Sequence, residues 1–166
     1  MAVAEVRWLT PDEQRTWRAF LQASFHLFAH LDRELEATVG MPMAYYQIMA
    51  MLSEAPDRTL RMRELADATS SSRSRLSHAV DRLEEKGWLR RVRCPHDRRG
   101  AFARLTDAGF DVLAAAAPAH VESVRRHLFD VLEPGQIEQL AQISEAVARA
   151  KPLPRSSAEK CTAGSV

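Results

Sequence analysis

The sequence predicts a mainly α-helical protein that carries one small β-hairpin, and three observations support this fold class. Long segments near both ends of the chain have apolar residues at helical spacing. Between them lie two short helical segments joined by a serine-rich turn, and two strand-like stretches then flank a turn-rich tip at 95–100. With 166 residues and 46% hydrophobic content, the chain is long enough for a well-packed core.

The first long helix is expected over residues 11–39. Thr10 and Glu13 have the spacing of a capping box, and Pro11 suits the first helical position. An apolar stripe follows at helical spacing, made of Trp17, Phe20, Leu21, Ser24, Phe28, Leu31 and Leu35.

Two more helices are expected near the other end, over 107–132 and 136–150, separated by Glu133, Pro134 and Gly135. Pro118 should end or kink the first of them near Ala114, because proline removes a helical hydrogen bond. The two terminal regions carry more apolar surface than the central lobe can cover. This surplus favours a two-fold dimer over a monomeric helical bundle.

The central segments have the pattern of a helix-turn-helix. A short helix is expected over 62–68, and a second begins after Ser72, whose hydroxyl can cap it. The apolar face of that second helix should pack inward and consists of Leu76, Ala79, Val80 and Leu83. The strands of the hairpin are expected over 88–93 and 101–105.

Charge is segregated along the chain, although the totals of 23 Lys and Arg against 22 Asp and Glu nearly cancel. Residues 73–104 hold ten basic and four acidic side chains, a net charge of +6, which leaves −5 for the remainder. A local positive lobe on an acidic body is typical of a protein that neutralises phosphates at one place, whereas a solvated charged face is the plainer interpretation.

The outer face of the second central helix is suited to DNA. It carries Ser74, His78 and Asp81, flanked by Arg75, Ser77 and Arg82. Hydroxyls, histidine and arginine can bond to base edges or phosphates in the major groove. An arginine-tipped hairpin can reach the neighbouring minor groove, where Asp97 would brace Arg99. These residues predict a winged helix-turn-helix protein that binds double-stranded DNA; a hairpin with solvated arginines is the alternative.

The same residues resemble the multiple antibiotic resistance regulator (MarR) family of bacterial winged-helix transcription factors over roughly 10–150. The resemblance lies in the run 65–83, in Asp-Arg-Leu-Glu-Glu-Lys-Gly-Trp at 81–88, in Asp-Arg-Arg-Gly at 97–100 and in Leu-Thr-Asp-Ala-Gly at 105–109. It implies that Asp97 supports the wing and that Arg99 enters the minor groove. The candidate DNA-binding residues are Arg73, Ser74, Arg75, Ser77, His78, Arg82, Arg98 and Arg99.

The resemblance also implies a homodimer formed by the terminal helices, whose two recognition helices would read a pseudo-palindromic operator. We therefore divide the chain into four parts. An N-terminal dimerisation segment (1–58) precedes a DNA-binding lobe (59–106) and C-terminal dimerisation helices (107–150). The tail (151–166) is expected to be disordered, because it is polar and interrupted by proline and glycine.

Regulation by a small aromatic or phenolic effector is a further implication of the resemblance. Such a ligand needs apolar walls with a few polar groups. The candidates for this pocket are Phe25, His26, His30, Tyr45, Tyr46 and Met49. The same residues also fit a packed core, which is the commoner meaning of an apolar stripe.

Cys94 offers an alternative, a redox-responsive repressor, because neighbouring positive charges favour a reactive thiolate; an incidental thiol is the plainer interpretation. His26 and His30 share a helix face, as do His120 and His127, but no carboxylate or cysteine completes a ligand set. We therefore expect histidines on polar faces or at the dimer junction, no metal site and no cofactor.

Several other classes are disfavoured. We find no phosphate loop, nucleophile elbow or metalloprotease motif, so an enzyme is not expected. No apolar run approaches a membrane span and the first residues do not resemble a signal peptide, which predicts a cytoplasmic protein. The function expected is that of a dimeric transcriptional regulator, specifically a repressor relieved by a ligand. A non-regulatory architectural DNA binder is the remaining alternative.

Overall fold

The computed structural model describes residues 6–94 and 97–149, and within these the side chains of 93–100 are outside the description. The predicted tail, 151–166, therefore lies outside the described residues. The described chain is mainly helical with one small antiparallel sheet, as the sequence predicts. None of its described helices is long and apolar enough to span a membrane.

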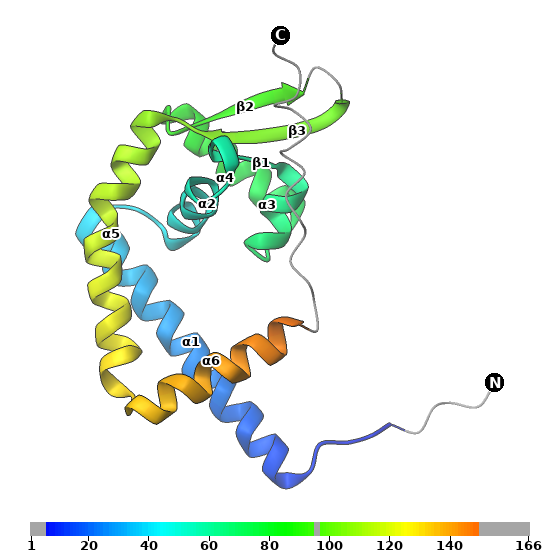
Figure 1. Ribbon diagram of the computed structural model, residues 1–166, viewed down its shortest axis with the longest axis vertical. Helices are drawn as coiled ribbons and strands as arrows, with labels where there is room; N and C mark the ends of the chain where they lie inside the picture. Colours follow the sequence, from blue (N-terminus) through cyan, green and yellow to red (C-terminus); the bar gives the residue numbers. More distant parts are fainter. Residues whose placement is uncertain (1–5, 95–96, 150–166) are drawn as a thin grey trace, which may run out of the picture.

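The molecule consists of a compact lobe and a helical arm (Figure 1). The arm contains α1 (Pro11–Val39) and α5 (Asp107–His127), which pack side by side, and α6 (Pro134–Arg149), which leaves the end of α5 remote from the lobe. The lobe contains α2 (Met43–Ser53), β1 (Thr59–Arg61), α3 (Met62–Ala68), α4 (Arg73–Glu85), β2 (Leu89–Cys94) and β3 (Asp97–Leu105). Two short 3-10 turns, η1 (Pro56–Arg58) and η2 (Phe129–Val131), complete the chain.

Helix α1 begins at the predicted capping box. The Thr10 hydroxyl accepts a hydrogen bond from the Glu13 amide at 3.3 Å, and the Glu13 carboxylate accepts one from the Thr10 amide at 2.7 Å. The helix ends at Gly40, whose φ of 64° is the left-handed conformation that glycine adopts without strain. Its apolar stripe divides along its length, because Leu31 and Leu35 are buried whereas the members nearer the N-terminus are exposed or half-buried.

The helix-turn-helix is confirmed. Helix α3 has its predicted bounds, and the Ser72 hydroxyl caps α4 by accepting the Arg75 amide at 3.3 Å. Leu76, Val80 and Leu83 of α4 are almost completely buried. They pack with residues from α2, α3, the sheet and α5 into one core, so the opposite face of α4 is held outward on a rigid base.

The sheet has the order β1-β3-β2 and contains the predicted hairpin. The predicted tip is too long, because β3 already begins at Asp97 and pairs there with Cys94. Backbone pairing has extended the ladder into a segment whose polar composition suggested a turn. Strand β1 was not predicted, since three residues are too few to show an alternating pattern.

The C-terminal helices differ from the prediction in two ways. Helix α5 does not end near Ala114 but continues through Pro118. Ala114 and Pro118 are both exposed, so water can satisfy the carbonyl that proline leaves without a donor. The helix then ends at His127, before the predicted residue 132, because Leu128 leaves helical geometry at φ −129°. Helix α6 begins at Pro134, earlier than predicted.

Candidate nucleic-acid interface

The outward face of α4 gathers the DNA-binding residues predicted for this helix. Five of them are exposed, and Ser77 is half-buried beside them: Arg73, Ser74, Arg75, His78 and Arg82. Because Leu76, Val80 and Leu83 hold the other side of the helix in the core, these polar groups project from a fixed base. The face therefore offers hydroxyl, imidazole and guanidinium donors within the first three turns of one helix.

Arg82 already has an intramolecular partner. Its guanidinium pairs with Glu85 at 2.8 Å, and this hydrogen bond raises the pKa of Arg82 above its ordinary value. Both side chains are exposed, and an exposed pair of this kind contributes little to stability. A phosphate can therefore replace Glu85 at small energetic cost.

Arg91 of β2 joins the hairpin to α4. Its guanidinium lies 2.6 Å from the Asp81 carboxylate and donates to the Ser77 hydroxyl at 3.2 Å and carbonyl at 3.3 Å. Its backbone N–H donates to the Glu84 carboxylate at 2.8 Å. One strand residue thus holds three residues of the helix, and we call this group the Arg91 clamp.

The Arg91 clamp was missed by the sequence reasoning, which placed Asp81 on the DNA-facing side without a partner. The only available signal was Asp81 and Glu84 three residues apart on one helix, followed by an arginine in a strand. That signal is weak, because arginine is common throughout this segment. The clamp offsets the negative charge of Asp81 next to a surface that would meet phosphates.

Two arginines face each other across the hairpin. Arg90 of β2 is the direct cross-strand partner of Arg104 in β3, and both side chains are exposed. Like charges directly opposite each other on a sheet are unfavourable in isolation. Their pairing increases the positive potential of the sheet and suits an anionic partner.

The remaining predicted wing residues fall where side chains are not described. Asp97, Arg98 and Arg99 occupy the first positions of β3, at the end of the hairpin remote from α5. The proposed redox residue, Cys94, is the last residue of β2, and its side chain is likewise outside the description.

The six predicted effector residues lie in different parts of the described structure. Met49 and Tyr46 belong to the core, Tyr45 is half-buried against it, and Phe25 and His26 are exposed on α1. A different feature lies between α1, α2 and the end of α3, a groove of about 720 Å³. We call it the α1–α2 groove; it is lined by Phe28, Ala29, Asp32, Met43, Ala44, Gln47, Met51, Ala68, Thr69 and Ser70.

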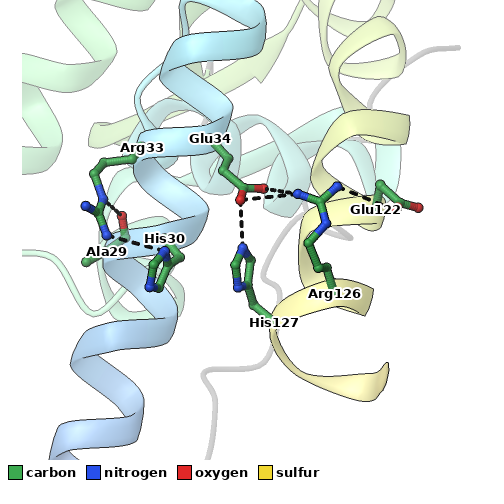
Figure 2. A network of polar contacts seen from close by, with 7 residues as sticks. All are labelled: Ala29, His30, Arg33, Glu34, Glu122, Arg126 and His127. Atoms are coloured by element: carbon green, nitrogen blue, oxygen red, sulfur yellow. Dashed lines mark hydrogen bonds and ion pairs between the residues drawn. The ribbon is translucent and has the colours of Figure 1, made fainter. Parts of the chain in front are cut away.

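His30, the sixth of these residues, belongs to a polar junction between α1 and α5 (Figure 2). Its ring stacks on His127 with centroids 4.7 Å apart, and His127 Nε2 lies 2.7 Å from the Glu34 carboxylate. Arg126 contacts the same carboxylate at 3.3 Å. The hydrogen bond from His127, aided by the positive charge of Arg126, lowers the pKa of Glu34 to about 2. Within the described residues, no group of three His, Cys, Asp or Glu side chains is arranged to hold a metal.

The exposed basic face of α4, set beside a basic hairpin, defines a winged helix-turn-helix protein of the DNA-binding class. Comparison with known proteins agrees. The model of the MarR family matches residues 39–100. The chain is 50% identical to Sco3205 from Streptomyces coelicolor, a MarR family transcriptional regulator solved in complex with DNA. This chain belongs to the MarR family of transcriptional regulators.

The extent of these matches differs between relatives. The match to Sco3205 covers 90% of this chain and 94% of that one, with a TM-score of 0.82. The regulator PecS of Dickeya dadantii is 34% identical over 52% of this chain and 49% of its own length. The transcriptional repressor MprA of Escherichia coli K12 is 27% identical over 63% and 59%. The chain thus spans about half to three-fifths of these two curated relatives. Its family consists of DNA-binding regulators, which are not enzymes.

Proposed function

We propose that this chain is a homodimeric repressor that binds a pseudo-palindromic operator and is released by a small-molecule effector. The observation that carries the proposal is the outward face of α4, where Arg73, Ser74, Arg75 and His78 are exposed above a fully packed core. Arg98 and Arg99 of the wing would add contacts in the minor groove, supported by Asp97. The label of repressor is supported by the named function of MprA.

The arm supports the homodimer. Large apolar side chains are exposed along its helices, in contrast to the buried core of the lobe: Trp17, Phe20, Phe25, Phe28, Val121, Ile143 and Val147 are each at least half exposed. Large apolar side chains exposed together on a soluble protein often mark an interaction site, so a second copy is the natural cover. We assign this role to residues 1–58 and 107–150, although α2 in the first segment also packs into the core of the lobe. DNA binding is assigned to 59–106.

The effector would act at the junction of arm and lobe. There the ring of Tyr46 lies against His120 with centroids 4.3 Å apart, and the buried Nδ1 of His120 has no hydrogen-bond partner among the described residues. An aromatic ligand with a polar group could satisfy that atom and change the packing of α5 against α2. To release DNA, it must bind one dimer geometry more tightly than the other.

Operator binding tests the proposal directly. The purified protein is titrated onto a labelled fragment of its own upstream intergenic DNA with excess unrelated DNA, across a salt series. We expect saturable, competitor-resistant binding with a steep salt dependence, and release by a phenolic acid. Binding that the competitor abolishes would instead indicate an architectural DNA-binding protein.

A pair of variants shows whether α4 reads the DNA. His78→Ala should weaken operator binding about tenfold or more, by loss of contacts to the bases or backbone. The control is Arg149→Ala at the far end of α6, where Arg149 pairs only with Glu145 among the described residues. Equal affinity of both variants would contradict the assignment of α4.

A further inference from the structure

The residues that precede α1, 6–10, are mostly apolar and exposed, and we call them the N-terminal segment. Val6, Trp8 and Leu9 are 61%, 83% and 56% exposed. In Figure 1 this segment projects away from the rest of the molecule. Exposure of these three side chains is costly in water, because each could bury apolar area against a partner surface.

The α1–α2 groove has the complementary character. Its walls include the apolar side chains of Phe28, Met43 and Met51, and Phe28 is 53% exposed. Methionine and aromatic side chains make favourable contacts with a tryptophan ring. The only charged residue in the lining is Asp32, and the N-terminal segment carries Arg7 next to Trp8. The N-terminal segment and the groove therefore match in both polarity and charge.

The N-terminal segment cannot enter the groove of its own chain. Helix α1 is continuous from Pro11 to Val39, and it separates Thr10 from Phe28 by ~27 Å at 1.5 Å per residue. From Thr10, the backbone can carry Trp8 back by at most ~7 Å. Residues 6–10 could therefore occupy this groove only in another molecule.

A second copy can fill it. If two α1 helices pack antiparallel around Phe20 with nearly aligned axes, residues whose numbers add to about 40 lie opposite each other. Trp8, just before α1, then comes close to Asp32 of the other copy. Trp17 and Phe20 stack with centroids 6.2 Å apart and are each about half exposed. This exposed aromatic pair thus lies where such a crossing needs apolar contact.

We propose that residues 6–10 of one protomer lie in the α1–α2 groove of the other, with Trp8 against Phe28, Met43 and Met51 and with Arg7 facing Asp32. This inference rests on the homodimer of the proposed function. Asp32 already accepts the Met43 amide with Oδ1 at 2.8 Å, and a carboxylate can accept further hydrogen bonds with its second oxygen. The N-terminal segment in this position would also touch Thr69 and Ser70, in the turn that leads into α4. The dimer would thereby help to fix the recognition helix of the partner.

Disulfide cross-linking tests the contact. In a background with Cys94→Ser and Cys161→Ser, we combine Val6→Cys with Ala44→Cys, since Val6→Cys keeps Trp8 in place and Ala44 is exposed in the lining of the groove. Mild oxidation should give a covalent dimer, and so should a mixture of the two single-cysteine proteins. The matched control replaces Ala44→Cys by Ala108→Cys, an exposed position at the start of α5; it should cross-link far less.

Light scattering on the same samples separates the two hypotheses. A dimer that cross-links no better than the control overturns only the contact of the N-terminal segment with the groove. A monomer overturns both the homodimer and this contact. Independently, Trp8→Ala should raise the dimer dissociation constant about tenfold or more, and Trp8→Phe should retain most of the affinity. Equal dissociation constants for Trp8→Ala and the native chain would also overturn the proposal.

Discussion

Arg91 shows how one side chain can hold the hairpin against the recognition helix. Its guanidinium is shared between Asp81 and Ser77 of α4, while its backbone belongs to β2. The wing and the recognition helix are thereby fixed relative to each other. The negative charge of Asp81 is also offset at the surface that phosphates would approach.

Arg91→Met should lower operator affinity about tenfold while leaving the dependence of affinity on salt nearly unchanged. The physical reason is that the clamp positions the wing and releases no counterions, whereas loss of a phosphate contact reduces the salt slope by about one. Arg90→Met is the matched control, because Arg90 is exposed next to it in β2 and should reduce the slope. If both variants reduce the slope equally, Arg91 contacts phosphate.

Arg99→Ala should weaken operator binding strongly while leaving the dimer and its melting temperature unchanged, because a wing arginine contacts DNA and not the core. Operator titration, light scattering and thermal unfolding measure the three quantities. Native-like affinity in this variant would remove Arg99 from the interface.

Glu34 links residue chemistry to the stability of the arm. Its folded pKa of about 2 lies below the ordinary value of 4.5, chiefly because His127 hydrogen-bonds to its carboxylate. A depressed carboxyl pKa contributes stability above pH 4.5 that is lost as the pH falls toward 2. Urea unfolding between these pH values should therefore show decreasing stability, and Glu34→Gln should flatten this decrease. An unchanged profile in the variant would mean that other carboxylates dominate.

The elements best predicted from sequence are those determined by local signals. The capping box at Thr10 and the serine cap at Ser72 act over three residues, so both helix starts can be predicted from the sequence alone. The inward face of α4 follows in the same way from the spacing of Leu76, Val80 and Leu83. Helix α5 was harder, because its passage through Pro118 depends on exposure of a carbonyl, which only the tertiary structure determines.

The same distinction applies to the candidate site. Helical phase could identify the basic face of α4, but the Arg91 clamp joins residues that are seven or more positions apart and in different elements. The α1–α2 groove likewise arises only when three helices pack together. Periodicity cannot predict such contacts, since it describes one element at a time.

The start of α5 depends on a glycine at a close approach between elements. A Cβ at Gly109 would lie 2.1 Å from the Trp88 carbonyl oxygen and 2.8 Å from Leu105 Cδ1. Gly109→Ala should therefore destabilise the protein by about 1–3 kcal/mol, the usual cost of overpacking. Gly135→Ala is the control, because nothing lies within 4 Å of a Cβ there; it should be neutral or stabilising by up to about 1 kcal/mol. Chemical denaturation measures both, and equal stability of the two variants would contradict the packing argument.

At the scale of the whole molecule, the lobe has a closed core and the arm does not. The fully buried side chains lie mainly in α2, α3, α4 and the sheet, whereas α6 has no buried residue in this chain. A lobe that folds around its own core can present α4 alone, whereas the proposed homodimer would cover the exposed aromatic residues of the arm. In the proposed homodimer, the paired arms would join two lobes and place their recognition helices about one turn of DNA apart, ~34 Å.

Phe20→Asp should separate these two properties. Phe20 is half exposed and lies outside the buried core, so the charge should disrupt the dimer while leaving each lobe folded. Operator affinity should then fall about a hundredfold or more, because a single lobe loses the gain from simultaneous binding of two half-sites. Gln22→Asp, on the exposed opposite side of α1, is the control and should leave a dimer with native affinity. Light scattering, circular dichroism and operator titration distinguish the outcomes: a dimeric Phe20→Asp protein would place the interface elsewhere on the arm, and an unfolded one would assign α1 to the folding of the lobe itself.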